Sequence, residues 1–248
     1  MDSGNIGFVL LCAAFVFVMT PGLAMFYGGL VRKKNVVNTM MTSIFIIGVG
    51  IVMWVLFGYS LSFAPSGNAF IGDFRWLGLE GVSLTEGYTD DASIPNMVFS
   101  AFQMMFAVIT PALITGAVAG RMKFKSIFVF TIFWSLIVYY PLAHMVWGQG
   151  GLLGADGIGA LDFAGGDVVH ISSGVSALVL CILLGKRHDY EHSIYRIHNI
   201  PTVVLGASLL MFGWFGFNAG SALAADGLAA HAFMTTGVSA AAAMLSWM

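Results

Sequence analysis

Seven long stretches of this sequence contain no charged side chain. They cover residues 6–31, 36–72, 94–120, 126–155, 168–185, 199–225 and 227–248. A helix that crosses a bilayer needs about 20 mostly apolar residues, so each stretch can supply one span. Charged residues make up only 9% of the chain, whereas soluble domains contain roughly 25%. We therefore predict an all-α, polytopic integral membrane bundle with seven transmembrane helices.

Lys and Arg side chains gather in three of the connections between these stretches. Nine of the ten follow the first, third or fifth stretch, and Arg75 is the exception. Because positive charge collects in cytoplasmic loops, this pattern predicts that the N-terminus lies outside. The first five residues, MDSGN, lack the positive segment of a signal peptide, so we interpret the first stretch as a span. The expected location is the cell membrane.

Several classes of function find no support in the residues. The ten basic residues form no long run, so we expect no nucleic-acid partner. Cys12 and Cys181 fall inside spans and are interpreted as small buried hydrophobes. His188, His192 and His198 share one loop with mixed charge, which favours a solvated loop over a metal site. We expect no metal or cofactor, and no nucleophile–base pair or phosphate loop indicates an enzyme.

The segment 139–174 interrupts the apolar pattern most sharply. An aromatic cluster ends the fourth stretch, and eight glycines follow between positions 148 and 166. Asp162 then precedes the fifth stretch, where its carboxylate is well placed to cap a helix N-terminus. His170 lies inside that stretch, and ionisable residues at membrane depth often mark a pathway. Spacing alone leaves open whether His170 is structural or part of a conduction path.

Aromatic residues cluster in two of the stretches. Tyr139, Tyr140 and Trp147 close the fourth stretch, and an anchor at the membrane interface is the plainer interpretation for them. In the third stretch, Phe99, Phe102 and Phe106 recur at helical spacing and therefore share one face. Such a stripe usually belongs to the core. Gln103 lies beside the stripe, and a buried amide needs a hydrogen-bond partner.

Small residues within the spans indicate close helix packing. The pairs Gly116–Gly120 and Gly216–Gly220 each have the GxxxG spacing that lets helices approach closely. The run 26–29, Phe-Tyr-Gly-Gly, is interpreted in the same way. Between the second and third spans, the polar segment 64–93 carries five acidic residues. A solvated loop is the plainer interpretation, although an acidic mouth also steers cations.

Five segments of the chain resemble the ammonium transporter family (the Amt, Mep and Rh proteins). They occur in the family's order and orientation and touch every span except the second and seventh. The segments are FYGGLVRKKN at 26–35, FQMMFAVITPALITGAVAGR at 102–121, YYPLAHMVWGQGG at 139–151, LDFAGGDVVHISSG at 161–174 and GWFGFNAGSA at 213–222.

The resemblance implies ammonium and ammonia as substrate, with methylammonium as an analogue, and roles for particular residues. A cation is recruited at an outer aromatic site, where ring faces attract it, and ammonia then passes through an apolar pore. Asp162 is expected to orient the site backbone and to favour a cation without touching it. The implied residues are Trp147, Phe106, Ser221 and Asp162 for recruitment, Phe106 and Phe217 for a gate, and His170, Trp214, Phe26 and Tyr139 for the pore.

The resemblance also implies an architecture that this chain only partly matches. Family members have eleven spans in two inverted five-helix repeats plus a last helix, with the pathway at the repeat interface. Within one membrane domain, 1–248, we expect residues 1–198 to form the first repeat and 199–248 to begin the second. The partner of His170 and the tail that binds PII-type regulators have no counterpart here. We therefore expect a truncated N-terminal portion of a lipid-embedded homotrimer, which does not conduct alone.

Other functions remain as alternatives. An ammonium sensor or a non-conducting subunit on the same scaffold would keep the recruitment residues. A retinal protein needs a Schiff-base lysine in its last helix, and no lysine follows Lys186. The intramembrane glycines and the matched segments argue against a seven-helix receptor.

Overall fold

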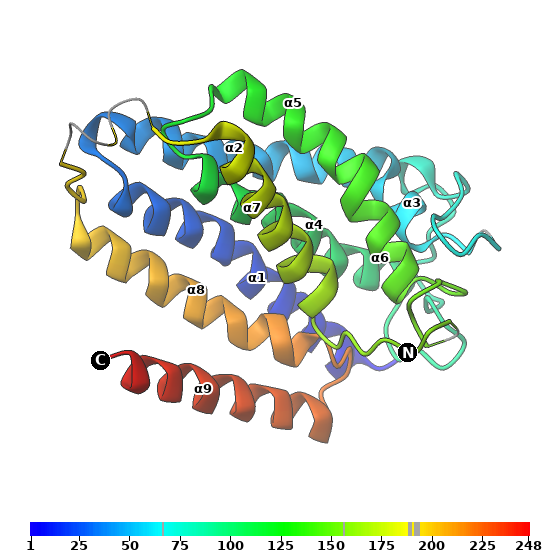
Figure 1. Ribbon diagram of the computed structural model, residues 1–248. Coiled ribbons are helices and arrows are strands. Elements are labelled where there is room, and N and C mark those ends of the chain that lie inside the picture. The colour runs from blue at the N-terminus through cyan, green and yellow to red at the C-terminus, as the bar shows by residue number, and fades with distance from the viewer. Residues whose placement is uncertain (66, 156, 188–189, 191–193) are drawn as a thin grey trace.

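The computed structural model describes residues 1–65, 67–155, 157–187, 190 and 194–248 (Figure 1). The described part is helical and contains no strand. Its α-helices are α1 (Ser3–Leu30), α2 (Val36–Met53), α3 (Tyr59–Phe63), α4 (Asn96–Val118), α5 (Phe124–Trp134), α6 (Tyr140–Trp147), α7 (Ser172–Leu184), α8 (Ile200–Gly220) and α9 (Gly227–Trp247).

Seven helical stretches are long and apolar enough to cross a membrane, and they confirm the predicted number of spans. Four of the spans are formed by α1, α4, α8 and α9 alone. In the other three a π-helical segment joins or precedes the α-helices, namely Trp54–Gly58, Ser135–Tyr139 and Gly166–Ile171. π-Helical turns often occur at functional sites. No sequence pattern predicted them.

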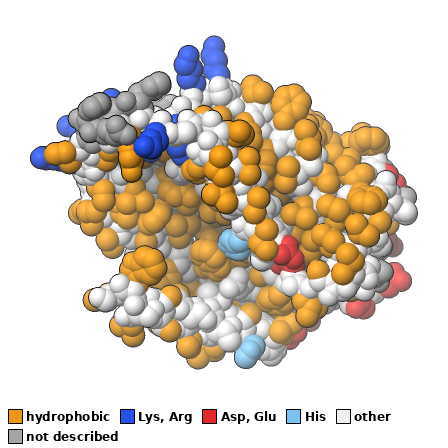
Figure 2. All heavy atoms as spheres, viewed as in Figure 1, with side chains coloured by type: hydrophobic (Ala, Val, Ile, Leu, Met, Phe, Trp, Pro, Cys, Tyr) orange, Lys and Arg blue, Asp and Glu red, His pale blue; other side chains and the backbone are white. Residues whose placement is uncertain are grey.

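The connections of the bundle gather at two ends, which differ in charge. The acidic end consists of the N-terminus and the described residues of segments 64–95, 148–165 and 221–226, and the basic end of those of segments 31–35, 119–123 and 185–199. Hydrogen bonds tie the acidic end together, from Asp2 N to Ser93 O at 2.8 Å and from Leu152 N to Ala69 O at 2.9 Å. In Figure 2 the Lys and Arg side chains lie toward the basic end and the Asp and Glu side chains toward the acidic end.

Helices α1 and α8 lie side by side with their backbones close together (Figure 1). A Cβ atom added at Gly216 would lie 2.7 Å from the Phe15 side chain, and one added at Gly220 would lie 2.6 Å from Cys12. These glycines therefore allow the close approach, as predicted from their spacing. The pair in α4 behaves differently. Gly116 packs beneath the Tyr27 ring, whereas Gly120 follows the helix with a φ of +70° and lies against the Asn35 side chain.

Helix α4 lies at the centre of the bundle, and 72% of its most apolar stretch is buried. Tyr139 and Tyr140 are buried as well, each 1% exposed, so the prediction that they anchor the chain at a membrane interface is wrong. The Tyr140 ring packs against the backbone of Gly58, where a side chain would collide with it. Tyr139 lies beside Trp134, with ring centroids 6.3 Å apart.

Candidate functional site

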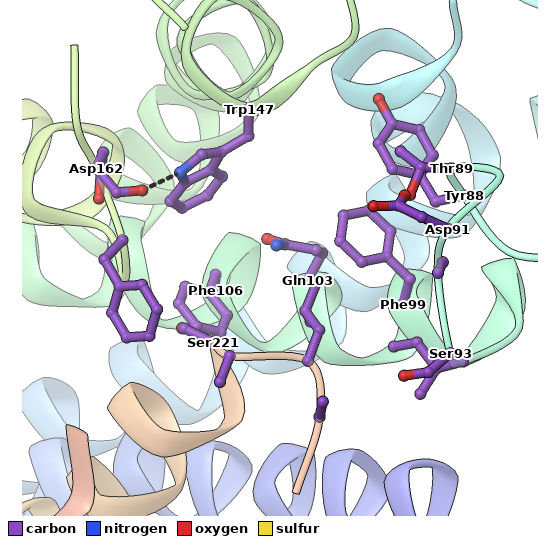
Figure 3. Close-up of a pocket in the computed structure, with 16 residues that line it drawn as sticks. Tyr88, Thr89, Asp91, Ser93, Phe99, Gln103, Phe106, Trp147, Asp162 and Ser221 are labelled. Carbon is purple, nitrogen blue, oxygen red and sulfur yellow. Dashed lines mark hydrogen bonds between the residues drawn. The ribbon is translucent and has the colours of Figure 1, made fainter. Parts of the chain in front are cut away.

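A cavity of about 410 Å³ opens at the acidic end of the bundle (Figure 3). Five separate parts of the chain line it: α4, the end of α6, the segment 148–165, the end of α8 with the residues after it, and residues 88–94 of the long loop. The sequence places these parts far from one another. The cavity therefore exists only because the helices of the bundle bring their ends together.

Helix α4 presents Phe99, Gln103 and Phe106 to the cavity, at positions i, i+4 and i+7 of one helical face. Phe102 shares the buried face as predicted, with its ring centroid 4.9 Å from that of Phe106, but it packs against Gly220 and does not line the cavity. The Gln103 side chain is buried at 8% exposure, and its Oε1 atom has no hydrogen-bond partner among the residues that the structure describes. The partner expected from the sequence is thus not found.

Asp162 holds the start of the fifth span. Its Oδ1 atom accepts hydrogen bonds from the N–H groups of Gly165 and Gly166 at 2.5 and 2.8 Å. Its Oδ2 atom accepts from Asp167 and Val168 at 2.8 and 3.0 Å. These bonds confirm the predicted cap, because they satisfy N–H groups that a helix start leaves without partners.

Asp162 also fixes the orientation of Trp147. The Nε1–H group of Trp147 donates to the backbone oxygen of Asp162 at 2.9 Å, as the dashed line in Figure 3 marks. The indole ring then lies nearly perpendicular to the ring of Phe106, with centroids 6.1 Å apart. Both rings line the cavity. One residue thus positions both the π-helical turn and an aromatic wall of the site.

Ser221 lies directly after α8, on the opposite wall of the cavity. Its Oγ–H group donates to the backbone oxygen of Phe217 at 2.8 Å. A hydroxyl that donates its one proton in this way keeps its oxygen lone pairs for accepting hydrogen bonds. Ser221 therefore offers the cavity an acceptor.

A row of rings leads from the cavity into the bundle. The Phe106 and Phe217 rings lie 4.2 Å apart between centroids, and each side chain is 1% exposed. Beyond them the His170 ring lies 6.0 Å from Phe217 and stacks on Trp214 at 5.4 Å with an interplanar angle of 13°. We call Trp147, Phe106, Phe217, His170 and Trp214 the aromatic row.

His170 occupies the π-helical segment that Asp162 caps. Its backbone N–H donates to Gly165 five residues earlier, at 3.0 Å. Within the described part of the chain, neither ring nitrogen of His170 has a hydrogen-bond partner. The assignment of His170 to a conduction path stays a prediction.

Phe26 and Tyr139, also assigned to the pore from the sequence, lie away from the row. Phe26 packs with its backbone against Gly206, and its ring lies 5.8 Å from Tyr27. Tyr139 is enclosed by Trp134 and Tyr140. Neither lines the cavity. Their assignment to the pore stays a prediction.

The loop wall of the cavity was not predicted in detail. Tyr88, Thr89, Asp91 and Ser93 line it, and Tyr88 stacks on Phe99 with ring centroids 4.8 Å apart. Burial raises the pKa of Tyr88 to about 12, so its hydroxyl is neutral at ordinary pH. The acidity of segment 64–93 was the signal that pointed to this wall.

No group of three or more His, Cys, Asp and Glu side chains is arranged to hold a metal ion in the part of the chain that the structure describes. His188 and His192 lie outside the described residues. The cavity combines aromatic faces, acceptor oxygens and a nearby carboxylate. Such a combination suits a small cation, because ring faces attract positive charge.

The sequence and the fold both match known proteins. The family model described as Ammonium Transporter Family matches residues 7–248. An ammonium transporter of Bacillus subtilis is 52% identical over the whole chain, which covers 59% of that protein. Ammonium transporter Amt1 of Archaeoglobus fulgidus is 42% identical, with 60% of it covered.

Two solved structures are similar to the chain as well. The crystal structure of Candida albicans Mep2 matches all of it with a TM-score of 0.89 at 34% identity, over 55% of that chain. A structure named Sensor Amt Protein matches 98% of it with a TM-score of 0.85 at 28% identity, over 60% of that chain. The present chain thus spans a little over half the length of these relatives.

Proposed function

This chain belongs to the Ammonium Transporter Family, and we propose that it forms the recruitment site and the upper pathway of a protein that moves ammonium nitrogen across a membrane. The substrate is ammonium, with methylammonium as an analogue. The observation that carries the proposal is the aromatic row, which connects the cavity at the acidic end to His170.

Recruitment begins in the cavity. The ring faces of Trp147 and Phe106 attract a cation, and the Ser221 hydroxyl oxygen accepts one of its N–H groups. The Asp162 carboxylate is already engaged by four backbone N–H groups. The carboxylate therefore favours the cation through its charge and does not bind the ion directly. The backbone oxygen of Asp162 orients Trp147.

The Phe106 and Phe217 rings act as a gate. With their centroids 4.2 Å apart, they leave no passage for a hydrated ion unless the rings move. An unpaired charge in an apolar, membrane-embedded pathway is costly. The ion therefore loses water at the cavity and gives up a proton at or above His170, so that ammonia passes the rings of His170 and Trp214. The proton returns to the acidic side or follows a separate route through the histidine.

Substitution of His170 tests the proposal. We expect His170→Ala to change the rate or the selectivity of methylammonium uptake into liposomes that contain the full-length protein. His231→Ala is the matched control, because His231 lies on α9 away from the row, and we expect it to have no effect. Uptake and selectivity unchanged by His170→Ala would contradict the proposed pathway.

Orientation and assembly are further parts of the proposal. The acidic end faces outside at the cell membrane, and the basic end, with its many Lys and Arg residues, faces the cytoplasm. The protein forms a homotrimer in lipid, and residues 1–198 and 199–248 belong to different repeats. A PII-type regulator would bind only where the protein carries the C-terminal tail. Labelling of Asp91→Cys and Lys34→Cys in intact cells with a membrane-impermeant thiol reagent tests the orientation. We expect only the variant at position 91 to react.

An ammonium sensor is the second candidate function. It is favoured by the similarity to the structure named Sensor Amt Protein, which covers 98% of this chain. A sensor would bind ammonium in the same cavity without moving it. Saturable binding of ammonium without uptake into liposomes would select this alternative.

A further inference from the structure

Gln103 is the polar side chain that the cavity leaves unsatisfied. It projects from the centre of the α4 face, between Phe99 and Phe106, and its amide group points into the cavity below Trp147 (Figure 3). The side chain is 8% exposed, and its Oε1 atom has no hydrogen-bond partner in the described part of the chain. A buried carbonyl oxygen without a partner destabilises a fold. The presence of Gln103 at this buried position therefore suggests that something in the cavity hydrogen-bonds to it.

Two donors at the site are already used. The Trp147 N–H group donates to Asp162, and the Ser221 hydroxyl donates to Phe217. Phe99 and Phe106, which flank the amide along α4, have no donor. No N–H or O–H group of the described residues reaches Oε1, so a hydrogen bond to it comes from the contents of the cavity. A volume of about 410 Å³ accommodates several water molecules, each of which takes about 30 Å³ in the liquid.

We propose that Oε1 of Gln103 accepts an N–H hydrogen bond from the cation in the cavity, and that this bond makes the site prefer cations that carry N–H groups. The inference rests on the proposed function and adds a binding residue to it. Ammonium then meets ring faces at Trp147 and Phe106 and two oxygen acceptors, Ser221 Oγ and Gln103 Oε1. A hydrogen bond with a charged partner is stronger than one between neutral groups, so ammonium displaces the water that occupies the acceptor in its absence.

The alkylammonium series separates this bond from the other attractions. Ring faces bind a quaternary ammonium as well as a protonated one, but tetramethylammonium has no N–H group to donate. A bond to Gln103 Oε1 is therefore available to ammonium and methylammonium and unavailable to tetramethylammonium. Removal of the acceptor weakens the first two selectively, whereas a disturbed cavity shape weakens all three.

The test uses Gln103→Leu, which keeps the size of the side chain and removes the amide. Uptake of radiolabelled methylammonium is measured in liposomes, with ammonium, methylammonium and tetramethylammonium as competitors. For N–H cations we expect the inhibition constant to rise about tenfold or more, as for loss of a hydrogen bond to a charged group. The constant for tetramethylammonium should stay the same.

Two further variants complete the test. Gln149→Leu removes an exposed amide at the acidic end that does not line the cavity. Its Nε2–H donates to the backbone oxygen of Tyr88, at 2.9 Å, so the substitution should change no inhibition constant. Gln103→Glu keeps an acceptor and adds charge, so it should restore or tighten the binding of N–H cations. Equal weakening of all three competitors by Gln103→Leu, or no weakening, would overturn the inference.

The outcomes also distinguish this inference from the function on which it rests. If the unmodified protein shows no methylammonium uptake that ammonium inhibits, the proposed function fails. If that uptake is present and Gln103→Leu leaves the three inhibition constants unchanged or raises them equally, only the role of Gln103 fails.

Discussion

Helix α8 contacts α1 on one face and α9 on another, and the two contacts differ in how closely the backbones approach (Figure 1). Toward α1, the glycines of α8 leave no room for a side chain, and a Cβ at Gly206 would overlap the backbone of Phe26. Toward α9, a cavity of about 560 Å³ separates the helices (Figure 2). We call these the closed face and the open face of α8.

The difference shows what holds the site in place. Phe217 and Ser221 are positioned by the closed face, because α8 cannot slide against α1 without collisions between backbones. On the open face, Asn218 Nδ2 donates to Thr236 Oγ1 at 2.8 Å, and only 11% of the most apolar stretch of α9 is buried. Substitutions paired across the two faces should therefore differ in their effects.

The largest difference is expected between two capping aspartates. Asp162→Ala, in the cavity that Ser221 of the closed face also lines, removes the acceptor of four backbone N–H groups and should destabilise the fold by about 3 kcal/mol or more. Asp226→Ala, at the start of α9, removes a single cap bond to Ala229 N and should cost about 1 kcal/mol. Thermal unfolding in detergent measures both. Equal losses would mean that the cap at Asp162 is no more important than an ordinary one.

The next difference concerns two glycines. Gly206→Ala on the closed face places a methyl group against the Phe26 backbone, and overpacking of this kind costs about 1–3 kcal/mol. Gly237→Ala on α9 places it 3.3 Å from the Phe215 ring, which can move into the open cavity. Because alanine favours helix, we expect stabilisation of up to about 1 kcal/mol there. Opposite signs in thermal unfolding are the expected result, and equal signs would break the comparison.

A smaller effect is expected in the pH dependence. The lining of the open cavity contains no ionisable side chain, whereas Tyr88 in the site has a pKa that burial raises from 10.0 to about 12. The folded protein holds this proton more tightly than the unfolded chain does. The associated stability is complete below pH 10 and is lost as the pH rises toward about 12.

The size of this loss follows from the shift, since one pKa unit corresponds to about 1.4 kcal/mol. We expect a loss of roughly 1–3 kcal/mol that Tyr88→Phe removes. Unfolding temperatures of both proteins between pH 9 and pH 12 measure it. Parallel curves would show that Tyr88 does not titrate differently in the fold.

Much of the fold follows from the sequence because span length and charge are local properties. The seven spans and the Asp162 cap were predicted from apolar stretches and from a carboxylate placed before one of them. The π-helical segments were not, since these spans are apolar on all sides and have no polar face whose shift would reveal an inserted residue. Tyr139 and Tyr140 were interpreted as interface anchors because aromatic residues near a span end also suit an interface. Tyr140 instead packs against Gly58, a contact between distant parts of the chain that only the structure reveals.

The site shows the same limit. Helical spacing placed Phe99, Phe102 and Phe106 on one face but could not say which neighbour each would meet. In the structure Phe102 packs against Gly220, and Gln103 lines the cavity between Phe99 and Phe106. The loop wall at Tyr88 depends on contacts over long distances along the chain, and no local pattern encodes them.

The central claim is that the cavity at the acidic end recruits ammonium through the aromatic row. Two tryptophans of the row test it directly, because Trp147 lines the cavity and Trp214 lies beyond the gate, on the open face. The measurement is the half-saturation concentration and the maximal rate of methylammonium uptake for Trp147→Leu and Trp214→Leu.

We expect Trp147→Leu to raise the half-saturation concentration about tenfold or more, since a desolvated cation–π contact contributes about 2 kcal/mol. Trp214→Leu should leave that concentration nearly unchanged and alter the maximal rate. A half-saturation concentration that Trp147→Leu does not change, or that both variants change equally, would contradict the account.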